Sequence, residues 1–568
     1  MYEIGNIYVI AAVAVVGGAL FGFDISSMSA IISTEAYLCY YNQGPLYLAT
    51  DGKCSGPSTD VQGGITAVMP GGSWLGSLCS GYISDKLGRK RAIQIGSVIW
   101  CIGSIIVCAS TSIGMLIGGR LINGLSVGIC SAQVPVYITE IAPPSKRGRL
   151  VGCQQWAITW GILIMFYISY GCSFIDGTAA FRVPWVLQML PAIFLFCAML
   201  FLPESPRWLA RQGRWDEAQH ILAITHANGD HDSPFVHKEL SEIREVVEFE
   251  QANADVTYWE LFKPKMLNRT HIGIFTQIWS QLTGMNVMMY YITYVFTMAG
   301  LGDSVLLPSS ITYIINVIMT IPALIYVDRW GLRPTLLIGA ILMMIFMFAN
   351  GGLFAQYGTT PLPNKFPSAA ESIAVSGPPA KAIIACTYLF VTSYAPTWGP
   401  VSWIYPSELY PLRVRGKLVA LTTSAKWAFN FALAYFVPPA FENIRWQVYI
   451  VFRVFCAAMF IHVLFLFPET SQKPLEVSED IFDDTTPGSI KGLGTPAWKT
   501  RVGNAGRGED EENAAGAESV SSEKEAKCES EDPKFENGRG RVMVGEKRRM
   551  RIWISELWKL FSCGVERV

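Results

Sequence analysis

The sequence predicts an all-α membrane protein with twelve transmembrane helices in two pseudo-symmetric halves of six. Its 568 residues are 51% hydrophobic and only 16% charged, whereas soluble domains carry about 25% charged residues. Twelve apolar runs have the roughly 20 residues that a helix needs to cross a bilayer core about 30 Å thick. One loop pattern also occurs twice between apolar runs, as GYISDKLGRKR from Gly81 and as VDRWGLRP from Val327. The repeat indicates two related halves, and many secondary transporters are built from halves that rock around a central site.

The apolar runs fall into two groups separated by a polar stretch. The first group lies at 6–27, 64–84, 92–111, 115–139, 150–171 and 183–203, and the second at 271–298, 306–327, 335–355, 381–405, 418–440 and 446–467. The first run starts almost at Met1 and is too long for the apolar segment of a signal peptide, so we interpret it as the first span.

These boundaries predict four regions. They are an N-terminal six-helix bundle at 1–203, a cytoplasmic loop with short amphipathic helices at 204–270, a C-terminal six-helix bundle at 271–470 and a cytoplasmic tail at 471–568. The tail is polar and in part strongly acidic, so we expect it to be disordered.

Basic residues predict the orientation of the spans. They cluster in loops of one parity, at 86–91, 146–149, 329–333 and 413–417, and short loops rich in Lys and Arg stay cytoplasmic. Both termini are then cytoplasmic, and the loops 28–63 and 356–380 face outside. Cys39 and Cys54 share the first of these outer loops, where the pattern favours two unpaired thiols over a disulfide.

Charge and cysteine spacing exclude several classes of protein. The formal net charge is −1, which gives no reason to expect nucleic-acid binding. The thirteen Cys include no CxxC pair and no Cys/His cluster at metal-ligand spacing. The sequence also has no nucleotide-binding loop and no catalytic triad pattern. We therefore expect no enzyme activity, no cofactor and no metal site.

Asp24 lies within the first span and is the main candidate for a functional charge. A charged side chain at the bilayer centre costs about 2.5–3.5 kcal/mol on insertion scales, so such residues usually carry function. Arg120, in the fourth span, is the strong candidate partner in this half. The alternative is a purely structural ion pair.

The motifs along the chain resemble those of the sugar porter family of the major facilitator superfamily. The resemblance extends from the first span to about residue 475. Beside the repeated loop, it rests on PVYITE from Pro135, PESPRWL from Pro203, QLTGMN from Gln281 and PET from Pro468. The stretches NVMMYY from Asn286 and WGPVSW from Trp398 look most like fungal high-affinity hexose transporters.

The resemblance implies a central sugar site. Amide groups supply both donors and acceptors for hydroxyls, and an indole ring can stack on a pyranose. The positions that match the family's sugar site are Gln155, Gln281, Asn286, Asn316, Trp403 and Lys426. Lys426 is a departure, because many relatives have Asn or Gln there. Ser280 is a second departure, because many relatives have Gln there, and Gln277 could compensate for it. Each amide taken singly could instead serve helix packing.

The resemblance also implies an inner latch of ion pairs that holds the two halves together. Its members are Asp85, Arg89, Glu140, Arg147 and Glu204 in the first half, and Asp328, Glu408, Arg415 and Glu469 in the second. Leu332 stands where Arg is usual, which predicts a weaker latch in the second half. The alternative is that these charges serve topology alone.

Together these observations predict a plasma-membrane importer of a monosaccharide, such as glucose or a related hexose or pentose. Asp24 would carry a coupled proton, and Arg120 would tune it. Its partners would be the sugar, the proton and the lipid bilayer, with no nucleic acid, and it would function as a monomer. Two alternatives stay open, a facilitative sugar uniporter and a sugar sensor with little transport.

Overall fold

The computed structural model describes residues 4–42, 54, 56–143, 146–227, 229–252, 258–301, 305–359, 374–410, 415–470 and 482. These residues are almost entirely helical, and β pairing within them is limited to one isolated bridge between Thr359 and Ala374. The predicted tail at 471–568 lies outside the described residues, apart from position 482. The all-α fold class is confirmed.

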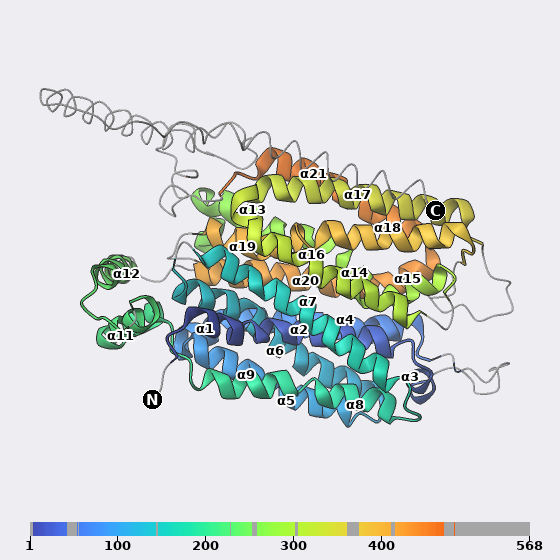
Figure 1. Ribbon diagram of the computed structural model, residues 1–568, viewed down its shortest axis with the longest axis horizontal. Helices are drawn as coiled ribbons and strands as arrows, with labels where there is room; N and C mark the ends of the chain where they lie inside the picture. Colours follow the sequence, from blue (N-terminus) through green and yellow to red (C-terminus); the bar gives the residue numbers. More distant parts are fainter. Residues whose placement is uncertain are drawn as a thin grey trace, which may run out of the picture. The chain divides into compact units, whose positions relative to one another are not determined.

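Nine helices in the described ranges precede the polar stretch at 204–270 and are coloured blue to teal in Figure 1. They are α1 (Ile7–Ala14), α2 (Val16–Ile31), α3 (Glu35–Tyr40), α4 (Thr59–Leu87), α5 (Arg89–Cys108), α6 (Ile113–Ile141), α7 (Arg147–Cys172), α8 (Ala179–Leu187) and α9 (Leu190–Met199). The first expected span corresponds to α1 and α2 together, and the sixth to α8 and α9.

Nine further helices follow the loop, coloured green to orange. They are α13 (Pro264–Leu282), α14 (Met285–Tyr290), α15 (Ile292–Met298), α16 (Leu306–Trp330), α17 (Leu332–Tyr357), α18 (Pro378–Tyr394), α19 (Trp398–Leu409), α20 (Arg415–Asn443) and α21 (Gln447–Leu466). The expected span at 271–298 is broken twice. The first break is at Gly284, whose φ of 83° is left-handed.

The chain is an integral, multi-pass membrane protein. Eight helical segments in the described ranges are long and apolar enough to cross a bilayer: 7–31, 89–108, 113–141, 148–172, 179–199, 306–327, 332–357 and 447–466. α4 and α20 also have the length to cross a bilayer, at 29 residues each, but polar and small residues in α4 and charged residues in α20 lower their hydropathy. The other expected spans are broken into shorter helices.

Small residues allow α4 and α6 to pack backbone against backbone. A Cβ atom on Gly124 of α6 would lie 2.9 Å from the Cα atom of Gly72 and 3.0 Å from the backbone nitrogen of Ser73, both in α4. Small residues at helix interfaces permit this kind of close approach in membranes. The α4–α6 contact holds in place the helices that carry Ile65 and Arg120.

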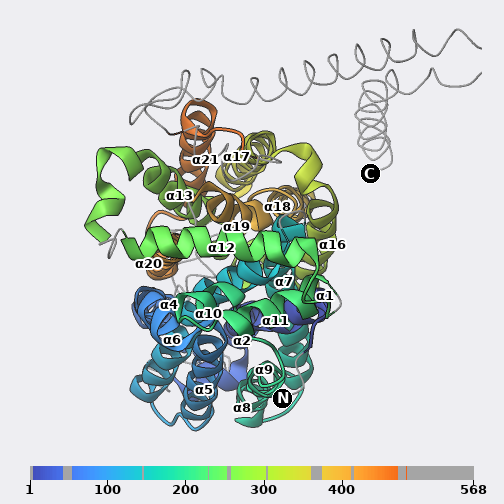
Figure 2. The same cartoon turned by 90° about the vertical axis from the view of Figure 1, so that its left-hand side faces the viewer.

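Three helices form a separate apolar cluster in the loop. They are α10 (Pro206–Arg211), α11 (Trp215–His226) and α12 (Pro234–Ala252), and they are followed by the short 3-10 helix η3 (Tyr258–Phe262). Leu222 and Val247 are among the residues buried between them. Figures 1 and 2 show α11 and α12 beyond the ends of the long helices. His226 ties this cluster to α6, since its Nε2 lies 2.8 Å from the Ile141 carbonyl oxygen.

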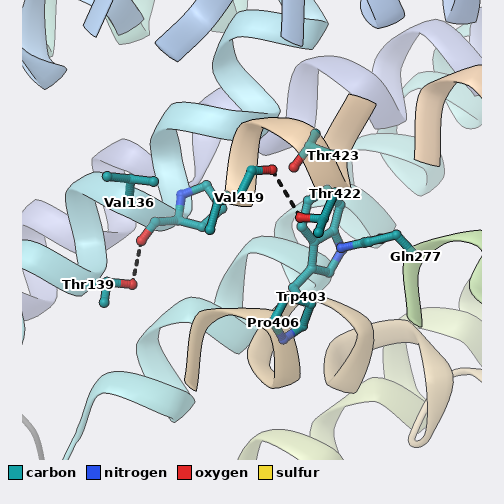
Figure 3. Close-up of a pocket in the computed structure, with 9 residues that line it drawn as sticks. Val136, Thr139, Gln277, Trp403, Pro406, Val419, Thr422 and Thr423 are labelled. Atoms are coloured by element: carbon teal, nitrogen blue, oxygen red, sulfur yellow. Dashed lines mark hydrogen bonds between the residues drawn. The ribbon is translucent and has the colours of Figure 1, made fainter. Parts of the chain in front are cut away.

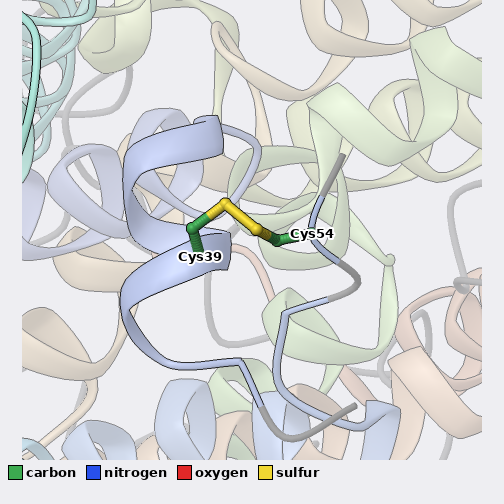
Figure 4. The surroundings of a disulfide bond; sticks show 2 residues. All are labelled: Cys39 and Cys54. Atoms are coloured by element: carbon green, nitrogen blue, oxygen red, sulfur yellow. A yellow bond between two sulfur atoms is a disulfide. The ribbon is translucent and has the colours of Figure 1, made fainter. Parts of the chain in front are cut away.

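A disulfide joins Cys39 of α3 to Cys54 (Figure 4). This corrects the sequence-based expectation of two unpaired thiols. The two Cα atoms lie 5.0 Å apart, which is within the range that a disulfide needs. A separation of 15 residues along the chain could not by itself reveal that the two cysteines lie this close in space.

Candidate functional site

Asp24 of α2 and Arg120 of α6 form a buried ion pair. Nη2 of Arg120 lies 3.0 Å from Oδ2 of Asp24, and each residue is 1% exposed. Nε of Arg120 also donates to the carbonyl oxygen of Ile65 in α4, at 2.8 Å. Three helices therefore meet at one charge pair. Loss of either partner would leave an unpaired buried charge, which is strongly destabilising.

Tyr290 of α14 faces this ion pair from a distant part of the sequence. It is fully buried and interacts electrostatically with both Asp24 and Arg120. Its hydroxyl has no hydrogen-bond partner within the described residues. Tyr290 lies within the NVMMYY stretch from Asn286, but the sequence did not single out its side chain, because a tyrosine in an apolar run also fits simple packing.

A second group joins α7, α19 and α20. Nε1 of Trp403 donates to Oε1 of Gln155 at 3.0 Å, and Nζ of Lys426 lies 3.7 Å from the centroid of the Trp403 ring. Trp403 and Lys426 are each 4% exposed, and Gln155 is 9% exposed. An indole, an amide and an ammonium group thus converge in the interior. Together they can stack on a sugar ring and bond its hydroxyls.

The other candidate amides lie on α13, α14 and α16. Nδ2 of Asn286 donates to Oε1 of Gln281, and Nε2 of Gln281 donates to Oγ of Ser280 at 3.0 Å. Nδ2 of Asn316 lies 3.9 Å from Sδ of Met289, and its buried Oδ1 has no partner in the described part of the chain. Among the described contacts, Gln155 and Lys426 each meet Trp403 and Gln281 meets Asn286, whereas Asn316 contacts none of the other five candidates directly.

A pocket lies beside Trp403, where α6, α13, α19 and α20 meet (Figure 3). Its lining is formed by Pro135, Val136, Thr139, Gln277, Trp403, Pro406, Val419, Thr422 and Thr423. Nε2 of Gln277 donates to the Ser402 carbonyl oxygen at 2.8 Å, whereas its buried Oε1 has no partner among the described residues. Gln277 thus offers an unused hydrogen-bond acceptor at this pocket. Ser280, which stands where many relatives have Gln, does not line the pocket.

Asn430 is a site candidate that the sequence analysis missed. It follows Lys426 by one turn of α20, is 0% exposed, and has no hydrogen-bond partner for either amide atom within the described ranges. Buried polar atoms are rarely left unpaired. The i, i+4 spacing from Lys426 was the available signal, since it places both residues on one helix face.

Arg89, at the start of α5, is the centre of the inner charge network. Its Nε lies 3.0 Å from Oε2 of Glu140 near the end of α6, and its Nη1 lies 3.5 Å from Oδ1 of Asp85. The Ser205 hydroxyl donates to the same Glu140 carboxylate. The structure therefore joins three of the expected latch residues directly.

Glu204 caps the first turn of α5. Its Oε1 accepts hydrogen bonds from the backbone N–H groups of Arg89 and Lys90, each at 3.0 Å, and a carboxylate is favoured at a helix N-terminus. Burial raises the pKa of the Glu204 carboxyl above its ordinary value, and the backbone N–H donors of Lys90 and Ser205 oppose that rise. Gly88, the residue just before α5, has a φ of 97°, which glycine adopts readily.

Glu469 caps α17 in the same manner. Its Oε1 accepts from the backbone N–H of Leu332 and its Oε2 from that of Arg333, both at 3.0 Å. Leu332 thus stands at the position equivalent to Arg89, and the cap does not need its side chain. The side chains of the other latch candidates, Arg147, Asp328, Glu408 and Arg415, lie outside the described part of the structure.

Comparisons with known proteins identify the family of this chain. A family of proteins described as sugar (and other) transporters matches residues 10–482. The chain is 47% identical over 510 residues to the MFS glucose transporter mfs1 of Aspergillus flavus, covering 88% of this chain and 92% of the relative. It is 45% identical to the high-affinity glucose transporter of Kluyveromyces lactis, with 87% of each chain covered.

A solved structure also shares the fold. It is that of the proton:xylose symporter XylE bound to 6-bromo-6-deoxy-D-glucose, with a TM-score of 0.69, 25% identity, and coverage of 84% of this chain and 99% of that one. These relatives are transporters rather than enzymes, as the sequence predicted. The chain therefore belongs to the sugar (and other) transporter family and has the major facilitator superfamily fold.

Proposed function

We propose that this protein imports a monosaccharide, such as glucose or a related hexose or pentose, together with a proton by alternating access. The observation that carries the proposal is the buried pair of Asp24 and Arg120, at 3.0 Å. The names of the relatives, two glucose transporters and a proton:xylose symporter, support the sugar and the proton respectively.

The ion pair offers a site for one proton. While Arg120 lies beside it, its positive charge stabilises the carboxylate form of Asp24. A conformation that separates the two groups but keeps Asp24 away from water would favour its protonation instead. Sugar binding can act on this step through α14, because Asn286 and Tyr290 lie one turn apart on that helix and Tyr290 faces the ion pair.

The remaining parts of the proposal concern the two halves. The bundles at 1–203 and 271–470 would rock about the central site, and ion pairs between the latch residues of the two halves would hold them closed on the cytoplasmic side. Both termini would be cytoplasmic, and the protein would act as a monomer in the plasma membrane.

The available energy is sufficient for accumulation. One charge moving through 100 mV is worth about 2.3 kcal/mol, and one pH unit adds about 1.36 kcal/mol. At one proton per sugar, the sum would support a gradient of about 500-fold for a neutral solute.

The test is uptake of radiolabelled glucose at clamped pH, with and without a protonophore, in cells that lack their own hexose carriers. Asp24→Asn is compared with the native chain and with Asp176→Asn, in which the substituted aspartate is exposed. We expect concentrative uptake in the native chain and in Asp176→Asn. Uptake should collapse with the protonophore and in Asp24→Asn, because both remove the proton cycle.

Other outcomes favour the alternatives. Uptake that only equilibrates, and ignores the protonophore, would make the protein a facilitator. If protein at the cell surface takes up no sugar, a sensor is favoured. Truncation at about residue 480 then separates the two, since a transporter keeps its uptake and a sensor loses its signal.

A further inference from the structure

Lys426 is a buried lysine without a carboxylate partner among the described residues. It is 4% exposed, and no described carboxylate lies within 4.0 Å of its Nζ, the limit that defines an ion pair. The buried arginines of the first half differ in this respect. Arg120 and Arg89 each have a carboxylate oxygen at 3.0 Å.

The side-chain nitrogen of Lys426 lies over the ring of Trp403, with Nζ 3.7 Å from the ring centroid. A cation–π contact compensates only in part for the hydration that a buried ammonium loses. An anion that entered beside Trp403 would supply the missing charge. The site is therefore better matched, in charge, to a substrate with one negative group than to a neutral one.

The neighbouring groups suit hydroxyls rather than further negative charges. Asn430, one turn along α20, has both amide atoms without a partner in the described part of the chain. Gln155 reaches Trp403 from α7, and Thr422 and Thr423, one turn before Lys426, line the pocket beside Trp403. A single cation among amides, hydroxyls and an indole ring matches a monocarboxylate that carries several hydroxyls.

We propose that the substrate site accepts a sugar acid, a uronate, whose carboxylate pairs with Lys426 while its hydroxyls bond the surrounding amides. This rests on the proposed function in so far as the site around Trp403 is the sugar site. It adds a consequence for transport. A uronate anion that moves with one proton carries no net charge, whereas a neutral sugar that moves with one proton carries one positive charge.

The test is direct binding to the purified full-length protein by titration calorimetry. The probes are D-galacturonate with D-galactose and D-glucuronate with D-glucose, since each pair differs only in the group at C6. We expect the native chain to bind at least one uronate more tightly than its neutral partner. Lys426→Gln should weaken that uronate by at least about thirtyfold, because it removes one partner of a buried charge pair.

Two further variants control for charge and folding. Lys426→Arg keeps the charge and should retain the preference for the uronate. Lys381→Gln removes an exposed lysine of α18 and should change nothing. In cells, uptake of the uronate should respond to the pH gradient but not to the membrane potential, whereas uptake of the neutral sugar should respond to both.

The outcomes separate the two proposals. Native protein that binds neutral sugars but neither uronate, or a Lys426→Gln variant with an unchanged uronate preference, would overturn the sugar-acid proposal and leave sugar import intact. Uronate binding that depends on Lys426, without proton-driven uptake of any sugar, would support the site and refute the symport mechanism.

Discussion

Replacement of Gly124 by Ala tests whether close packing of α4 and α6 stabilises the fold. The added Cβ would lie 2.9 Å from the Cα atom of Gly72 and 3.0 Å from the backbone nitrogen of Ser73. Both atoms belong to the backbone of α4, so no side chain can rotate away and the helices must separate. Overpacking of this kind costs about 1–3 kcal/mol.

Gly118 of the same helix is the matched control. A Cβ atom there meets nothing within 4 Å, and Ala is more stable than Gly in a helix interior by about 0.5–1 kcal/mol. The gain in helix propensity applies to both single-methyl variants, so their stabilities should differ by the overpacking cost alone, about 1–3 kcal/mol.

The assay is thermal unfolding of the purified protein in one detergent at one scan rate, followed by tryptophan fluorescence. We expect Gly124→Ala to unfold below the native protein and Gly118→Ala at or above it. If Gly124→Ala unfolds at the native temperature, the helices are not in backbone contact at this point, and the packing argument fails.

Three further predictions follow from other contacts. Arg89→Gln removes the ion pair with Glu140 and should raise the accessibility of cysteine probes placed on the cytoplasmic side. The control Arg214→Gln breaks an exposed pair with Glu217 and should not change their labelling. Equal labelling of the two variants would refute a latch at Arg89. Replacing Cys39 and Cys54 by Ser together should lower stability by about 3 kcal/mol, as expected for a loop of about 15 residues, and mass spectrometry of the unreduced native protein should show the bond. Trp403→Phe keeps a ring but loses the hydrogen bond to Gln155, so the KM for sugar uptake should rise several-fold; an unchanged KM would place the sugar elsewhere.

The sequence could predict features that depend on regular periodicity or on strong charge penalties. Apolar runs of membrane length gave the helices, because a bilayer constrains length and composition together. A lone carboxylate in an apolar run needs a partner, and Arg120 was the strong candidate in its half. The structure places these two side chains 3.0 Å apart.

Features that depend on the path of irregular chain could not be predicted in the same way. A spacing of 15 residues does not show whether two cysteines lie close in space, so the expectation of free thiols was wrong. The grouping of Gln155 with Trp403 likewise depends on how α7 meets α19, and a sequence does not specify which amide faces which ring. Asn430 was missed because an unpaired amide is recognised only after all its neighbours are known.

The capping carboxylates Glu204 and Glu469 have a consequence for mutational tolerance. Each binds backbone N–H groups, which every residue except proline possesses. The first residue of the capped helix is arginine in α5 and leucine in α17, and the hydrogen bonds from the backbone to the capping carboxylate are present in both. The two copies of the repeated loop can therefore differ in side chains while the helix that follows each copy keeps the same carboxylate cap.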